Sequence, residues 1–118
     1  MSSRKKPHIP DQRTIAFHQK AADILIQHPE RLADIHQVLD NWLKLEDTQA
    51  EEWAKKWKQI IDGLSAKEVA KLILEEGELA DFYRKSSPFP TLLSESDRLE
   101  IINKYRFEYE KGAPGTHS

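Results

Sequence analysis

Apolar residues recur every three or four positions along most of the chain, which is the spacing of one face of an α-helix. Three helices are predicted in the first half, over about residues 11–27, 28–46 and 48–63. Pro29 suits the first turn of the second helix, and Thr48 and Glu51 have capping-box spacing at the start of the third. No segment favours a β-strand.

The strongest start signal belongs to a fourth helix. Ser65 and Glu68 have the spacing at which each side chain caps the other residue's exposed backbone N–H, and Gly77 is expected to end this helix. The segment "ELADFYRKS" then adds one or two further turns. A last helix is expected from Ser94 to near Gly112.

These elements predict an all-α fold, a single compact bundle of five or six short helices. The chain has 118 residues, which is enough for one hydrophobic core, and we expect one helical domain over residues 11–111. The basic segment 1–10 and the segment 112–118 are expected to be disordered tails. Three tryptophans fall on helical stripes and are expected in the core: Trp42, Trp53 and Trp57.

The composition excludes several kinds of site. The chain has no cysteine, so it has no disulfide, no thiolate zinc site and no cysteine nucleophile, which is typical of a reducing compartment. No apolar run approaches the length of a membrane span, and none follows the basic residues at the front to make a signal peptide. We therefore expect a cytoplasmic protein that does not associate with membranes.

The net charge of −2 hides an uneven distribution along the chain. Residues 21–83 carry about twice as many acidic as basic side chains, whereas Arg4, Lys5 and Lys6 make the front basic. A nucleic-acid-binding domain usually presents a basic face, so we do not expect nucleic acid as a partner of the folded part. Whether the basic N-terminal segment contacts nucleic acid is left open.

No pattern of catalytic or metal-binding residues is recognisable. His18, His28 and His36 do not form the i, i+4 pair of a helical zinc motif, and no serine lies in a Gly-x-Ser-x-Gly elbow. His18 lies on an apolar stripe and is expected to be a buried core histidine. We therefore expect no enzymatic activity, no catalytic residue, no bound metal and no cofactor.

Two groups of carboxylates are candidates for a binding surface. The first is expected near the end of the fourth helix, where the negative end of the helix dipole disfavours acidic residues; it comprises Glu75, Glu76, Glu78 and Asp81. The second comprises Glu46, Asp47, Glu51 and Glu52. Each group is interpreted either as a solvated rim or as a surface that faces a basic partner.

The stretch "SSPFP" sets a phenylalanine between two prolines. Pro88 and Pro90 each restrict the preceding residue, so Ser87 and Phe89 are expected to be extended and the ring to be held in a narrow range of directions. Such a ring either packs into this protein's own core or anchors a partner, because a rigid aromatic side chain loses little entropy on binding. Both alternatives stay open.

The same stretch resembles a C-terminal pattern of small helical bacterial proteins, Arg-x-Ser-Ser-Pro-Phe followed by Leu-Ser, an arginine and an apolar pair. The matching residues are Arg84, Ser86, Ser87, Pro88, Phe89, Leu93, Ser94, Arg98, Ile101 and Ile102. Looser similarity covers His18, Pro29, Trp42 and Trp53, and the chain departs from the pattern at Pro90, Thr91 and Leu99. The resemblance implies an antitoxin or accessory component whose gene lies beside that of a second, often nucleotidyltransferase-like, protein.

Two functions are therefore considered. In the first, the chain is a non-enzymatic, antitoxin-like protein-binding module that blocks a toxin or a nucleotidyltransferase-like partner through an acidic helical surface. Its candidate binding residues are Glu75, Glu76, Glu78, Asp81, Arg84, Phe89 and Arg98. In the second, residues 65–86 form the helix-turn-helix of a DNA-binding transcriptional regulator, although the acidic segment between its helices argues against contact with phosphates. The identity of the partner and the oligomeric state are left open.

Overall fold

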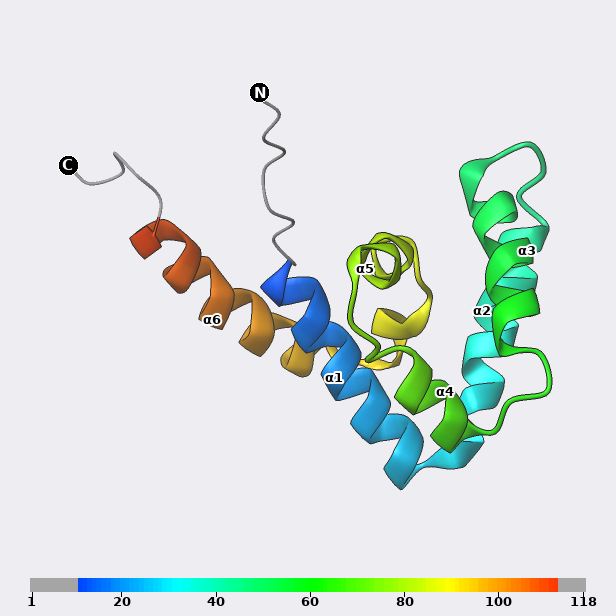
Figure 1. The fold of residues 1–118 in the computed structure, drawn as a ribbon, viewed down its shortest axis with the longest axis horizontal. Helices are drawn as coiled ribbons and strands as arrows, with labels where there is room; N and C mark the ends of the chain where they lie inside the picture. The colour runs from blue at the N-terminus through cyan, green and yellow to red at the C-terminus, as the bar shows by residue number, and fades with distance from the viewer. Residues whose placement is uncertain (1–10, 113–118) are drawn as a thin grey trace.

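The computed structural model describes residues 11–112, with side chains to residue 105, and this part of the chain contains helices and no strand. Figure 1 shows the arrangement. The elements are α1 (Gln12–Gln27), η1 (Pro29–Arg31), α2 (Leu32–Leu43), α3 (Gln49–Ile61), α4 (Ala66–Leu72), α5 (Glu78–Arg84), η2 (Phe89–Leu92) and α6 (Glu95–Gly112), where η is a 3₁₀-helix. The all-α bundle predicted from the apolar spacing is confirmed. Residues 1–10 and 113–118, where disordered tails are expected, lie outside the described part.

Side-chain caps fix where several helices begin. The capping box at α4 is present as predicted: the Ser65 amide donates to Glu68 Oε1 (2.8 Å), and the Glu68 amide donates to Ser65 Oγ (3.2 Å). At α3, Thr48 Oγ1 accepts from the Glu51 amide (3.2 Å), but Glu51 Oε1 accepts from the Asp47 amide (3.0 Å) instead of completing a box with Thr48. Asp47 has a positive φ of 64°, which belongs to the tight turn between α2 and α3.

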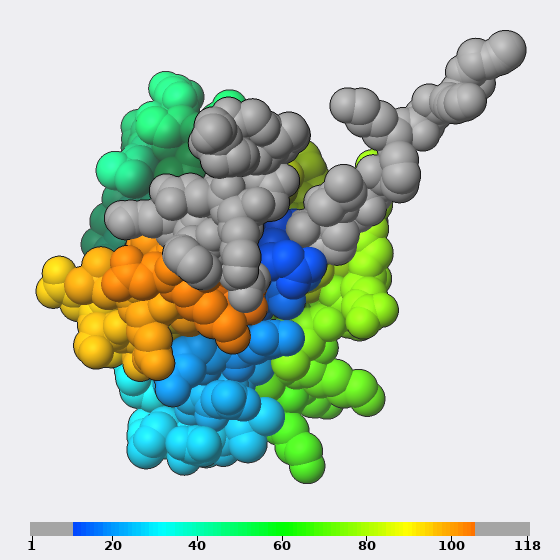
Figure 2. All heavy atoms as spheres, turned by 90° about the vertical axis from the view of Figure 1, so that its left-hand side faces the viewer, coloured from blue at the N-terminus to red at the C-terminus, as the bar shows by residue number. Residues whose placement is uncertain are grey.

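The long α1 helix organises the bundle. It contacts α4, α5, α6 and η2, while α2 and α3 pack against each other as a hairpin on one side (Figure 1). On the side of the molecule away from the α2–α3 hairpin, α6 lies across α1 (Figure 1; Figure 2). The largest buried apolar side chains come from α1 to α4, the residue that follows α4, and η2, and they form one core: Leu25, Ile35, Leu39, Ile61, Val69, Ile73 and Phe89. Trp57 is buried in this core, and Trp42 and Trp53 pack against it half-buried.

The fourth helix is shorter than the sequence suggests. It ends at Leu72, and Gly77 precedes α5 as its N-cap residue with φ of 128°, a conformation that side-chain-bearing residues rarely adopt. The prediction that Gly77 ends the fourth helix is therefore wrong. Glu75 and Glu76 lie in the linker between the two helices, and Glu78 lies in the first turn of α5, where the helix dipole favours acidic residues instead of disfavouring them.

Phe89 lies in the protein's own core and is fully buried. Its ring packs edge-on against Trp57, with centroids 5.3 Å apart, and tilts against His18 at 6.2 Å. The expectation that Phe89 is extended is wrong, because it opens η2; the Thr91 amide and hydroxyl both donate to the Pro88 carbonyl, at 3.1 and 2.6 Å. Pro90 fits this first turn because no backbone N–H is needed there.

Among residues 11–112, no helix is both long and apolar enough to cross a membrane.

Candidate partner-binding site

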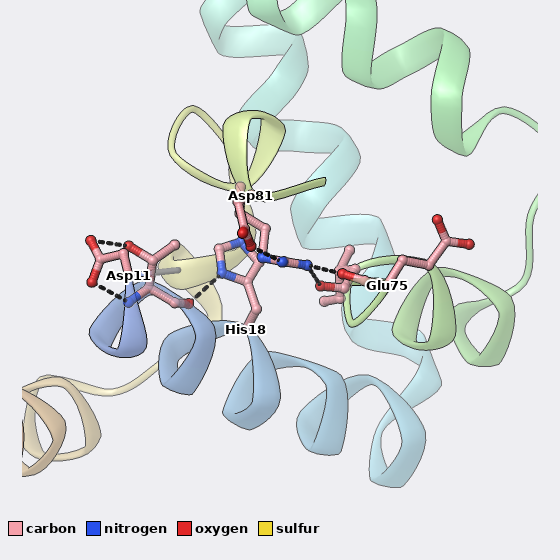
Figure 3. A network of polar contacts seen from close by, with 7 residues as sticks. Asp11, His18, Glu75 and Asp81 are labelled. Atoms are coloured by element: carbon pink, nitrogen blue, oxygen red, sulfur yellow. Dashed lines mark hydrogen bonds and ion pairs between the residues drawn. The ribbon is translucent and has the colours of Figure 1, made fainter. Parts of the chain in front are cut away.

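A buried arginine ties the α4–α5 linker to α5. Arg84 Nη1 donates to the carbonyls of Ile73 (3.0 Å) and Glu75 (2.6 Å), and Nη2 forms an ion pair with Asp81 Oδ1 (Figure 3). Both charged residues are only 6% exposed. Because one guanidinium nitrogen donates to two carbonyls of the linker, the buried arginine holds the linker in one conformation.

One nitrogen of this arginine remains without an acceptor. Arg84 Nε is the single buried side-chain nitrogen or oxygen of the described residues that has no hydrogen-bond partner. An unmet buried donor of this kind costs about 1–3 kcal/mol. The linker is therefore held by Nη1 alone, while Nη2 pairs with Asp81 within α5.

His18 lies beside this arginine and is fully buried, as expected from the sequence. A carbonyl only accepts, so Nδ1–H donates to the Thr14 carbonyl (2.8 Å) and Nε2 accepts from the Ser87 hydroxyl (2.5 Å). Burial lowers the pKa of His18 to about 4; the hydrogen bond to Thr14 opposes this shift, and the charge of Arg84 adds to it. The imidazole is therefore neutral near pH 7.

The serine–histidine contact has the geometry of a nucleophile and its base, but its chemistry is unsuited to that role. A general base works best with a pKa near the operating pH, whereas the pKa of His18 lies near 4. Neither of the two surface hollows described below is lined by His18 or Ser87. The contact instead fastens the segment before η2 to α1.

The helix α5 buries a charged face and exposes an apolar one. Its charged pair, Asp81 and Arg84, faces the interior, whereas Leu79 and Phe82 are 66% and 56% exposed. The Phe82 ring lies against Trp53 with centroids 5.5 Å apart. The helix therefore buries a salt bridge and leaves two large apolar side chains in contact with solvent.

A hollow of about 430 Å³ lies between this helix, the linker and α3. Its apolar lining includes Trp57, Ile60, Leu72, Leu79 and Tyr83. Three carboxylate residues, Glu75, Glu76 and Glu78, also line it. The volume lies within the range of about 300–1,000 Å³ that is typical of ligand pockets.

These three residues, here called the linker acidic group, are exposed, and the described residues include no ion pair with any of them. Figure 3 shows the Glu75 carboxylate pointing away from Arg84 although the Glu75 carbonyl accepts from it. The linker acidic group is therefore positioned by its backbone while its charges face solvent.

The second predicted group of carboxylates, here called the α3 acidic group, comprises Glu46, Asp47, Glu51 and Glu52. Glu51 accepts from the Asp47 amide and forms an ion pair with Lys55 Nζ at 3.7 Å. Glu51 and Glu52 lie in the first turn of α3, where the helix dipole favours negative charge. Contacts within the protein therefore account for the Glu51 carboxylate, and no member of the group lines either hollow.

The structure brings together only part of the predicted binding set. Glu75, Glu76 and Glu78 gather at one exposed hollow. Arg84 lines this hollow with them, although its side chain is only 6% exposed. Asp81 and Phe89 are buried and line neither hollow, so the structure does not bring them to this surface.

Arg98 is exposed but lies elsewhere. It lines a second hollow of about 400 Å³ at the start of α6, together with Leu93, Leu99 and Ile102. The two hollows share no lining residue. Arg98 therefore does not join the linker acidic group.

The apolar part of the site was not predicted from the sequence. Leu79 and Phe82 are three positions apart, so they share a helix face, but no orientation was assigned to that face. The signal that could have revealed its orientation is the spacing of Asp81 and Arg84, an i, i+3 ion pair that can satisfy itself when buried.

Comparison of the chain with protein-family models, with curated proteins and with solved structures finds no match. Among the described residues, no three histidine or carboxylate side chains gather as metal ligands.

Proposed function

We propose that this protein is an antitoxin-like binding module that neutralises or regulates a partner protein through the surface around α5. The observation that carries the proposal is the orientation of α5: Leu79 is exposed at the hollow and Phe82 is exposed on the same helix, while Asp81 and Arg84 are buried. Keeping an ion pair inside and apolar side chains outside is unfavourable for an isolated domain, but it suits a surface that a partner covers.

The charge at this surface favours a basic partner. Glu75, Glu76 and Glu78 surround apolar side chains, and an apolar centre with a charged rim is the usual anatomy of a protein–protein interface. Carboxylates at the rim attract a positively charged partner and repel an acidic one. A protein that handles nucleotides or nucleic acid presents such a basic face at its substrate site, and covering that face requires no catalytic group.

The antitoxin-like role itself rests on the resemblance of residues 84–102 to the pattern of such proteins. Within that pattern, Arg84, Ser87 and Phe89 have structural roles in this chain, since they hold the linker, His18 and the core. The matching residues therefore support the architecture that presents the hollow, and the contacts with the partner fall to Leu79, Phe82 and the linker acidic group.

The helix-turn-helix alternative receives less support. Its second helix would be α5, whose exposed positions include Glu78, Leu79 and Phe82. A carboxylate next to apolar side chains is a poor match for DNA phosphates.

The test is co-purification with the protein encoded by the neighbouring gene. We expect the pair to be retained at about 0.05 M salt and weakened at about 0.5 M, because salt screens an acidic-to-basic contact. Glu75→Lys combined with Glu78→Lys should abolish retention, and the matched reversal of Glu46 and Glu52 should preserve it. A partner that binds both variants equally, or no binding to the neighbouring gene's product, contradicts the proposal.

A further inference from the structure

We propose that the hollow at α5 receives one bulky apolar side chain from a partner segment in which lysine or arginine flanks that side chain. This inference rests on the proposed function and specifies the chemistry of the partner at the same site. The occupant is thus a basic peptide segment with an apolar anchor, and neither a charge-only contact nor an apolar small molecule satisfies both parts of the site.

The apolar anchor follows from the lining of the hollow. Ile60, Leu72 and Tyr83 surround a space of about 430 Å³, and exposed Leu79 lies beside them. Burial of apolar surface contributes about 25 cal/mol per Å² to association, so a Leu, Met or Phe side chain is favoured in this space over a polar one.

The basic flanks follow from the rim. Glu75, Glu76 and Glu78 line the same hollow, are exposed, and have no ion pair with any described residue. A segment whose anchor enters the hollow must place its neighbouring side chains near these carboxylates. Basic neighbours gain attraction there, whereas acidic neighbours meet three like charges.

The site is also held ready for an occupant. Arg84 fixes the Ile73 and Glu75 carbonyls, and Trp57 Nε1–H at the floor donates to the Ser86 carbonyl (3.1 Å). Because both sides of the hollow are fixed by buried or partly buried hydrogen bonds, the linker does not need to be ordered when the segment binds. Preorganisation of this kind reduces the entropy that binding loses.

The test uses the full chain and three labelled peptides, measured by fluorescence anisotropy. The first is Gly-Lys-Lys-Leu-Lys-Lys-Gly, the second replaces its leucine by glycine, and the third replaces its lysines by glutamates. We expect saturable binding of the first peptide, at least about tenfold weaker binding of the second, and no binding of the third.

Two exposed leucines provide matched variants. Leu79→Asn removes an apolar side chain of the hollow, whereas Leu45→Asn removes one that is 50% exposed beside the α3 acidic group and that lines neither hollow. We expect Leu79→Asn to lower the affinity for the first peptide at least about tenfold and Leu45→Asn to leave that affinity unchanged. Circular dichroism checks that both variants keep their helices.

Equal binding of the leucine and glycine peptides overturns the inference, because charge alone would then account for it. Absence of binding by the first peptide at about 1 mM also overturns it. Neither result affects the proposed function, which fails separately if the linker reversals leave co-purification intact. Binding that responds equally to Leu79→Asn and Leu45→Asn would place the peptide outside the hollow and so overturn the inference as well.

Discussion

The two acidic groups of this protein have similar sequences and different surroundings. In the α3 acidic group, Glu51 caps the turn, pairs with Lys55 and lies where the helix dipole favours it. In the linker acidic group, the backbone of Glu75 is held by buried Arg84, while its carboxylate faces solvent at the edge of an apolar hollow. Carboxylates that already have partners stabilise the fold; those that face solvent are available to another molecule.

The difference shows that the role of a cluster of like charges depends on the polar contacts beneath it. Under the linker acidic group lies a buried polar network, Arg84 with Asp81 and His18 with Ser87. The α3 acidic group has its polar contacts at the surface, within the turn that it caps. Changes in the buried network should therefore alter folding strongly, whereas changes in the exposed carboxylates should alter stability little.

The largest effect is expected from Arg84→Met. Removing one member of a buried ion pair leaves the Asp81 carboxylate buried without its arginine and two carbonyls without a donor, so unfolding free energy should fall by about 3–5 kcal/mol. Urea denaturation measures the loss. The exposed neighbour Lys85, changed to Met, should stay within about 0.5 kcal/mol of the original protein. A loss below about 1 kcal/mol for Arg84→Met would mean that the arginine does not hold the linker.

The next effect is pH dependence through His18. Its pKa is about 4 in the folded protein, against an ordinary value of 6.5 that the unfolded chain should show, so the unfolded chain binds the extra proton between these values. Stability should therefore be unaffected by His18 above about pH 6.5 and should fall as pH drops from 6.5 toward 4, by roughly 3 kcal/mol in total.

The control for that effect is His18→Gln, which removes the titrating group. Thermal unfolding of both proteins across this pH range isolates the histidine contribution, because all carboxylates are common to the two chains. Parallel pH profiles would show that burial does not suppress protonation of His18.

A smaller effect separates the acidic groups directly. Glu51→Ala removes a carboxylate that accepts from the Asp47 amide and pairs with Lys55, and it should cost about 1 kcal/mol. Glu76→Ala removes an exposed carboxylate of the linker and should change stability by no more than about 0.5 kcal/mol. If urea denaturation shows that both variants lose the same unfolding free energy, the two acidic groups do not differ in their contribution to stability.

Sequence patterns predicted the parts of the fold that depend on local chemistry. The Ser65–Glu68 box and the stripe containing Ile35 and Leu39 act within one helix, so their spacing is sufficient. The all-α bundle followed from such stripes. Gly77 was recognised as a boundary, but whether it ends one helix or begins the next depends on the linker carbonyls, which are satisfied by Arg84 from a different helix.

The site was only half predictable for the same reason. Glu75, Glu76 and Glu78 are neighbours in sequence and remain neighbours in space. The orientation of Leu79 and Phe82 depends on burial of the Asp81–Arg84 pair and on packing against α3, which local periodicity does not encode. Phe89 lies in a 3₁₀ turn because Thr91 closes it onto Pro88, a contact that overrides the extended preference before proline.

The central claim is that the linker acidic group binds a protein partner and the α3 acidic group does not. Calorimetric titration of the neighbouring gene's product into the two charge reversals, Glu75→Lys with Glu78→Lys and Glu46→Lys with Glu52→Lys, compares them at equal change in net charge. We expect at least about a hundredfold loss of affinity in the first and less than about threefold in the second. Equal losses in both would show that only overall charge matters, and a larger loss in the second would place the binding surface at α3.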